Sequence, residues 1–199
     1  METMAQTSSS SITLASLIDG GAAQPALAAH LDALDPAARV REVEALSGAT
    51  QKRLWEACAG APAFTLDDLV PPSVGEGQTV IYAGKNSLAA FTHFEKRFQR
   101  RGGEIVGYNH QPMSFVTGPG YFTVVQSPED PRELLFDYTR VPAEAPPGWP
   151  PVKSNRAGLS RFVYRDLHDF NRRVSRDVTI GSATRLGKVM DSYFVLARR

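Results

Sequence analysis

The spacing of apolar residues changes once along the chain, at a linker rich in Pro and Gly near residues 71–77. Before this linker, apolar residues recur every three or four positions, as in Leu27, Leu31 and Leu34, with Pro, Asp and Gly residues between the stripes. This spacing predicts helices over residues 12–76. Residues 1–11 are Ser-rich and have no apolar period, so we expect a flexible tail there.

Beyond the linker, alternating β-branched and aromatic residues replace the helical period. Strands are predicted, in chain order, at residues 79–83, 104–110, 113–117, 121–126, 133–140, 161–164, 178–184 and 192–198. Residues 159–174 also fit one face of a helix. A helix is expected at residues 87–101, because Leu88, Phe91, Phe94 and Phe98 recur at helical spacing.

Together these elements predict an α+β protein. Its helical N-terminal third is followed by a strongly curved antiparallel sheet or small barrel of about seven to eight strands, with one helix inserted after the first strand. Residues 77–199 would form the barrel-like domain, packed with the helices of residues 12–76 as one unit. Residues 141–158 contain five prolines and no clear period, so we expect a loop that covers or contacts something.

Length and composition narrow the class of protein. A chain of 199 residues with 42% hydrophobic and 22% charged residues is long enough to bury a core. Its apolar runs are far shorter than the roughly 20 residues that a membrane-spanning helix needs. A secretory signal would require Lys or Arg near its start, and none precedes Arg39. The single Cys58 favours a reducing compartment. We therefore expect a cytoplasmic protein.

Charge is distributed unevenly along the chain. Residues 1–84 contain 4 basic and 10 acidic side chains, whereas residues 85–199 contain 18 basic and 11 acidic ones. The later segment could therefore bind an anionic partner, or the two segments could neutralise each other across their interface. The candidate anion-binding residues are His93, Arg97, Arg100, Arg101, Arg172, Arg173 and Arg176. The first four would form one ridge on the expected helix, where they could equally interact with the helix dipole.

Sequence motifs give no support for common catalytic or metal sites. The four histidines lack the spacings of metal ligands, and no Gly-x-Ser-x-Gly nucleophile motif is present. Ala83-Gly84-Lys85-Asn86-Ser87 has one glycine, too few for a phosphate-binding loop. We therefore predict neither a metal nor a cofactor.

Polar and aromatic residues recur on neighbouring predicted strands. If the sheet closes, alternation directs some of them into its interior, where their polar groups could orient a ligand in an apolar cavity. The candidate ligand-binding residues are Tyr108, His110, Tyr121, Tyr138 and Tyr164. Tyrosines on strands are also ordinary sheet residues, so a filled core remains the alternative.

The C-terminal third resembles small bacterial proteins named for a Gly-x-Trp-x-Gly signature. The resemblance lies in residues 163–167, 170–177, 180–181 and 193–198, and Tyr82-Ala83-Gly84-Lys85 is similar to a Trp-Tyr-Gly-Lys element of those proteins. The naming signature is absent, since Trp55 lies in Leu54-Trp55-Glu56-Ala57. The resemblance implies a lipocalin-like or pleckstrin-homology-like curved antiparallel sheet and adds little about function.

Three functional hypotheses follow. The leading one is a non-catalytic binding protein that holds a small, largely apolar ligand in the curved sheet. The first alternative is a module that binds nucleic acid or a phospholipid surface through the basic residues. The second is an enzyme that uses His110 or His168 with Asp137 as an acid and base pair. The oligomeric state is left open.

Overall fold

The computed structural model describes residues 12–88, 92–112 and 114–199. The expected tail at residues 1–11 lies outside the described part. The helical N-terminal region comprises α1 (Leu14–Asp19), α2 (Gln24–Ala33), α3 (Pro36–Glu44), α4 (Gly48–Ala57) and α5 (Leu66–Leu69). Side chains cap four of these helices, because Thr13, Asp35, Ser47 and Thr65 each accept a hydrogen bond from a backbone N–H in the first turn.

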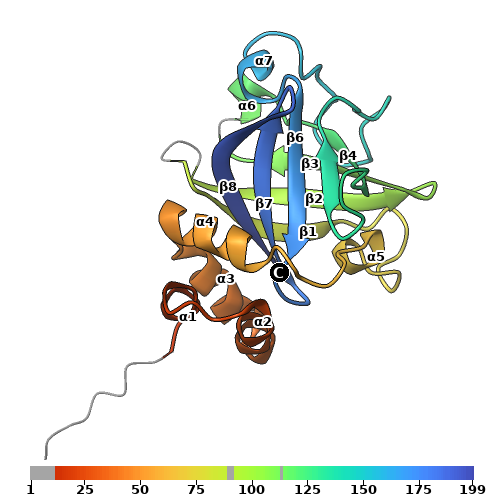
Figure 1. Ribbon diagram of the computed structural model, residues 1–199. Helices are drawn as coiled ribbons and strands as arrows, with labels where there is room; N and C mark the ends of the chain where they lie inside the picture. The colour runs from red at the N-terminus through yellow and green to blue at the C-terminus, as the bar shows by residue number, and fades with distance from the viewer. Residues whose placement is uncertain (1–11, 89–91, 113) are drawn as a thin grey trace, which may run out of the picture.

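Eight antiparallel strands form a closed barrel in which each strand pairs with the next along the chain (Figure 1). The strands are β1 (Val80–Asn86), β2 (His93–Arg101), β3 (Glu104–His110), β4 (Phe122–Gln126), β5 (Leu134–Asp137), β6 (Leu167–Arg173), β7 (Val178–Arg185) and β8 (Lys188–Arg198). Pairing of β8 with β1 closes the barrel. The predicted α+β class and barrel are thereby confirmed.

Three local predictions are wrong. Residues 93–101 of the expected helix form strand β2, which alternates inward Phe94, Lys96 and Phe98 with outward polar residues. Phe91, which contributed to the helical spacing, lies outside the described residues. Two expected strands are short helices instead: residues 114–117 of the strand expected at 113–117 form α6 (Ser114–Thr117), and α7 (Ser160–Val163) replaces the strand at 161–164. Residue 113 lies outside the described residues. The ambiguous segment 159–174 contains both α7 and strand β6.

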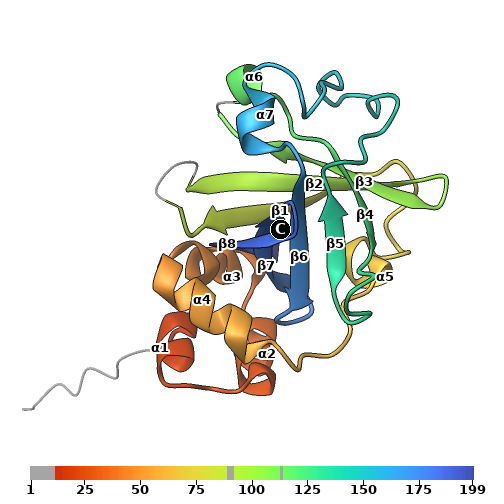
Figure 2. The same cartoon turned by 45° about the horizontal axis from the view of Figure 1, so that its top comes forward.

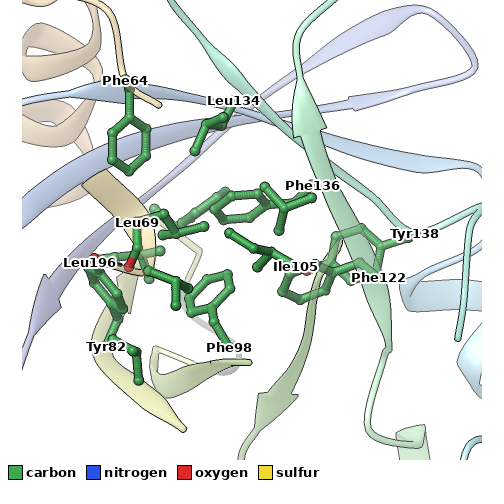
Figure 3. Packing of buried hydrophobic residues seen from close by; sticks show 14 of the residues in the cluster. Phe64, Leu69, Tyr82, Phe98, Ile105, Phe122, Leu134, Phe136, Tyr138 and Leu196 are labelled. Carbon is green, nitrogen blue, oxygen red and sulfur yellow. Dashed lines mark hydrogen bonds between the residues drawn. The ribbon is translucent and has the colours of Figure 1, made fainter. Parts of the chain in front are cut away.

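One half of the barrel interior is filled with apolar side chains (Figure 3). The rings of Phe98, Phe122 and Phe136 pack against one another with centroids 5.3 to 5.8 Å apart. Helix α5 closes this end of the barrel, where the Tyr82 hydroxyl donates a hydrogen bond to the Leu69 carbonyl over 2.9 Å. Burial of these rings and aliphatic side chains is the main stabilising contribution inside the barrel.

Glycines face phenylalanines across neighbouring strands and make room for their rings. Gly107 is paired with Phe122, and Gly181 with Phe194. A Cβ atom at Gly107 would lie 2.5 Å from the Phe122 ring, and one at Gly181 would lie 2.1 Å from the Phe194 ring. Each ring therefore lies across the backbone of its glycine partner, which lets large aromatic side chains share a narrow barrel.

Helix α4 covers the outer face of β7 and β8, and α3 packs on β8 and β1, while α1 packs against α3 and α4 with α2 beside it (Figures 1 and 2). Val178, Ile180 and Val195 point outward into a second apolar cluster with these helices. Ion pairs join the acidic and basic segments, including Asp68 with Arg173 at 3.2 Å. The expected mutual neutralisation of the two segments thus occurs in part.

The proline-rich loop at residues 141–158 lies across the outer face of β3 and β4. The Trp149 ring packs on Tyr108, with centroids 4.7 Å apart, and the Tyr121 hydroxyl donates a hydrogen bond to the Pro150 carbonyl over 2.6 Å. The Asn155 side chain donates to the backbone carbonyls of Tyr121 and Tyr138. The loop therefore covers part of the barrel wall, as its composition suggested.

Within the described ranges, none of the helices combines the length and apolar character needed to span a membrane.

Candidate ligand-binding site

A cavity of about 310 Å³ lies in the barrel beside α7. Helices α6 and α7 lie together at the end of the barrel opposite α5 (Figure 1). Its wall is mostly apolar and comes from six of the strands, from α7 and from the segments that follow β1, β3 and β5. The volume lies at the lower end of the range typical of small-molecule sites. The described residues that line it are Asn86, Leu88, Phe94, Lys96, Asn109, Gln111, Tyr138, Phe162, Val163, Tyr164, Leu167, Asp169, Ala183, Arg185, Met190, Ser192, Tyr193 and Phe194.

A buried polar cluster forms the floor of the cavity, which we call the Lys96 cluster: Lys96, Asn109, Tyr138 and Asp169. Strand register brings these residues together. Lys96 on β2 faces Asn109 on β3, and Asp169 on β6 faces Phe136 on β5, which is two residues before Tyr138. The Lys96 ammonium donates hydrogen bonds to Asp169 Oδ2 at 3.1 Å, Asn109 Oδ1 at 3.0 Å and the Tyr138 hydroxyl at 2.5 Å. The Lys96 and Asp169 side chains are 2% and 5% exposed.

Aromatic rings surround the Lys96 ammonium. Its Nζ lies 4.8 to 5.7 Å from the ring centroids of five residues. Such contacts attract a cation to the ring faces when it is shielded from water. The five residues are Phe94, Phe122, Phe136, Tyr138 and Phe194.

Burial also changes the proton affinities in the Lys96 cluster. Loss of hydration lowers the pKa of Lys96, and the Asp169 carboxylate opposes this effect. The pKa of Tyr138 is raised well above its usual value, because burial and the nearby Asp169 charge disfavour the phenolate. The floor therefore holds one cation and one anion that balance each other, beside a neutral phenol.

Helix α7 borders the opening of the cavity, and α6 packs beside α7. Arg185 of β7 donates hydrogen bonds to the Phe162 and Val163 carbonyls of α7, and Ser160 Oγ donates to the Thr117 carbonyl of α6. Phe162 is 63% exposed although it lines the cavity, and Leu88 is 53% exposed. The opening is thus bordered by apolar side chains that face solvent.

The structure divides the tyrosines predicted to bind a ligand into two groups. Tyr138 and Tyr164 line the cavity, with their rings stacked at 5.5 Å. Tyr108 and Tyr121 point to the outside of the barrel and pack under Trp149. His110 is exposed at the end of β3 and contacts the edge of Tyr108.

Three residues of the Lys96 cluster were missed by sequence reasoning: Lys96, Asn109 and Asp169. Each occupies an inward position of its strand, so the correct register on β2 would have placed a lysine inside the barrel. The expected helix at residues 87–101 concealed that signal.

The predicted anion-binding residues do not form a single face. On strand β2, the Arg97 guanidinium pairs with Glu95 at 2.7 Å, whereas Arg100 points to the α5 end and pairs with Asp67. His93 and Arg101 occupy opposite ends of β2. The three arginines of the β6–β7 region each face a carboxylate: Arg172 faces Glu133, Arg173 faces Asp68 and Arg176 faces Asp32.

The expected acid and base pair is partly present. His168 Nε2 lies 3.3 Å from Asp137 Oδ1 across β5 and β6. Both side chains lie on the outer face of the barrel and are not among the residues lining the cavity. The Asp137 carboxylate also accepts two hydrogen bonds from Thr139. This pair therefore lies apart from the cavity.

A second hollow of about 410 Å³ is open to solvent beside α3. Three apolar residues and two arginines line it: Pro36, Ala37, Val40, Arg41 and Arg199. It lacks the enclosed wall and converging polar groups of the barrel cavity. Among the residues that the structure describes, no cluster of His, Cys, Asp or Glu has the arrangement of a metal site.

Comparisons with protein-family models, with curated proteins and with solved structures find no match to this chain. The resemblance to the Gly-x-Trp-x-Gly proteins therefore stays a prediction. The geometry of the cavity carries the functional argument alone.

Proposed function

We propose that the protein binds a small, largely apolar ligand in the barrel cavity, with one polar group of the ligand directed at the Lys96 cluster. The observation that supports this proposal is a half-empty barrel: the α5 end is filled, whereas about 310 Å³ stays open at the other end. A barrel of eight strands with a cavity at one end is the arrangement by which lipocalins hold ligands. We therefore describe the proposed site as lipocalin-like.

The charges in the cavity floor favour a ligand without net charge. Lys96 is already balanced by Asp169 and uses its three N–H groups on Asp169, Asn109 and Tyr138. An anionic ligand would place a second negative charge beside Asp169, at a cost that burial increases. A carbonyl or hydroxyl group avoids this repulsion and can exchange hydrogen bonds with the floor.

Stability alone gives little reason to bury such a pair. Replacing a buried ion pair by apolar residues of similar volume is often neutral or stabilising by about 1–4 kcal/mol. A lysine and an aspartate at the wall of an open cavity are therefore better explained by binding than by folding. The single buried Cys58 keeps the cytoplasmic location as our expectation.

Titration with N-phenyl-1-naphthylamine, a neutral apolar fluorophore, tests the proposal. We expect saturable binding of one probe per chain. Ala183→Phe fills the cavity from β7 and should abolish binding, whereas Ala29→Phe, the same change on the exposed surface of α2, should not affect it. Absence of saturable binding, or equal binding by the two variants, would refute the proposed site.

A further inference from the structure

We propose that Lys96 forms a covalent iminium with an apolar aldehyde that enters the barrel cavity. This inference rests on the proposed function and goes beyond it, since it gives the ligand a carbonyl group and the site a reversible covalent step. Four observations carry it: the position of the amine, its acid and base partners, its apolar surroundings and the charge balance of the floor.

The Lys96 amine is placed to meet a ligand in the cavity. Its side chain projects inward from the middle of β2, is 2% exposed and lines the cavity floor. The chain has four other lysines, and none of them lines this cavity. Lys188, for example, is exposed at the start of β8. A ligand confined to the cavity therefore meets a single primary amine.

The neighbours of Lys96 include a base and an acid. Attack on a carbonyl carbon requires the neutral amine, and Asp169 Oδ2, at 3.1 Å from Nζ, can accept the ammonium proton. The Tyr138 hydroxyl, at 2.5 Å from Nζ, can donate a proton to the developing alkoxide. Burial supports this exchange, because it lowers the pKa of Lys96.

The step balances in atoms and charge. The Nζ lone pair of the neutral amine forms a bond to the aldehyde carbon while the carbonyl π electrons move to oxygen. The oxygen takes a proton from the Tyr138 hydroxyl, and the nitrogen returns one of its two protons to the phenolate, which gives a neutral carbinolamine. The proton that Asp169 took from the ammonium then moves to that oxygen, the C–O bond breaks, and water leaves as the C=N bond forms. In sum, one ammonium and one aldehyde give one iminium and one water. The iminium retains the positive charge of the ammonium, so Asp169 remains its counter-ion.

The surroundings select the class of aldehyde. Phe94, Tyr164 and Phe194 line the cavity above the floor, and Phe162 borders its opening. A flat aromatic or conjugated aldehyde fits such walls by stacking. The apolar wall also limits access of water to the iminium, which favours its persistence.

The test uses cinnamaldehyde as the probe and sodium cyanoborohydride as the hydride donor, which reduces an iminium to a stable secondary amine. Peptide mass spectrometry then locates the adduct on the wild-type protein. We expect labelling of Lys96 at least about tenfold above that of Lys188, because confinement raises the effective concentration of the aldehyde at the amine. Excess N-phenyl-1-naphthylamine should suppress the label at Lys96 and leave the label at Lys188 unchanged.

The outcomes separate this inference from the proposed function. Labelling of Lys96 at or below the level of Lys188, in protein that binds N-phenyl-1-naphthylamine normally, would overturn the iminium and leave the binding site standing. Labelling of Lys96 that the competitor does not suppress would also overturn it, since reaction would then not occur in the cavity. Failure of the wild-type protein to bind N-phenyl-1-naphthylamine would overturn both the iminium and the proposed binding site. Lys188→Arg should leave the Lys96 label intact.

Discussion

Replacing Lys96 by Met removes the cation of the Lys96 cluster while preserving an unbranched side chain of similar length. Asp169 Oδ2 accepts hydrogen bonds from Lys96 and from Tyr138, so the variant retains only the contact with the phenol. The carboxylate, 5% exposed, is then a buried anion without a counter-ion. It must either stay charged in an apolar site or take up a proton, and both reduce stability at neutral pH.

The expected cost is about 3–5 kcal/mol, the range found when one partner of a buried ion pair is removed. Loss of the contacts between the ammonium and five aromatic rings acts in the same direction. The free energy of unfolding of a typical domain is about 5–15 kcal/mol, so such a loss is a large share of the total stability. The double variant Lys96→Met/Asp169→Leu removes both charges and should recover most of it.

Urea denaturation followed by circular dichroism measures these differences through the shift in midpoint. Lys188→Met, the same change at an exposed position, is the matched control and should alter stability by less than about 0.5 kcal/mol. The reasoning would be refuted if Lys96→Met cost under about 1 kcal/mol, or if the double variant were as unstable as the sum of both single variants.

Three further predictions concern packing and proton affinity. Gly181→Ala should lower stability by about 1–3 kcal/mol in thermal melting because the Phe194 ring must move, whereas Gly60→Ala, with open space around it, should change little. Cys58 should not react with Ellman's reagent at pH 8 until the protein is unfolded, because burial raises its pKa to about 12; stoichiometric reaction of native protein would contradict this. Burial also raises the pKa of Tyr164 to about 12, from about 10 in the unfolded chain, so the folded state binds more protons between these values. The contribution of Tyr164 to stability is therefore complete below pH 10 and is lost towards pH 12. The urea midpoint should be lower at pH 11 than at pH 9, and an unchanged midpoint would contradict this prediction.

Most of the fold could be predicted from the sequence because its elements carry local signals. Strand β3 occupies residues 104–110 as expected, since alternation and the glycines before it define both ends. Strand β2 was misread because Phe94 and Phe98 fit a helical stripe. On a strand the residue between them, Lys96, also points inward, and a buried lysine contradicts the usual alternation of apolar and polar positions.

The candidate site could be predicted only in part, for the same reason. Tyr138 and Tyr164 were found because aromatic hydroxyl groups in predicted strands are recognisable as potential ligand contacts, although Tyr138 directly follows β5 and Tyr164 ends helix α7. Lys96 and Asp169 are 73 positions apart in the sequence and lie on different strands. Only the closed barrel brings Lys96 Nζ to 3.1 Å from Asp169 Oδ2. Local patterns fail where a functional residue breaks the rule that its neighbours follow.

A crystal structure of the protein with N-phenyl-1-naphthylamine tests the central claim most directly, because it locates the bound ligand. We expect electron density for one probe inside the barrel, against Tyr164 and Phe194 and above the Lys96 cluster. Density for the probe in the open hollow beside Val40, with the barrel cavity filled by side chains, would contradict it.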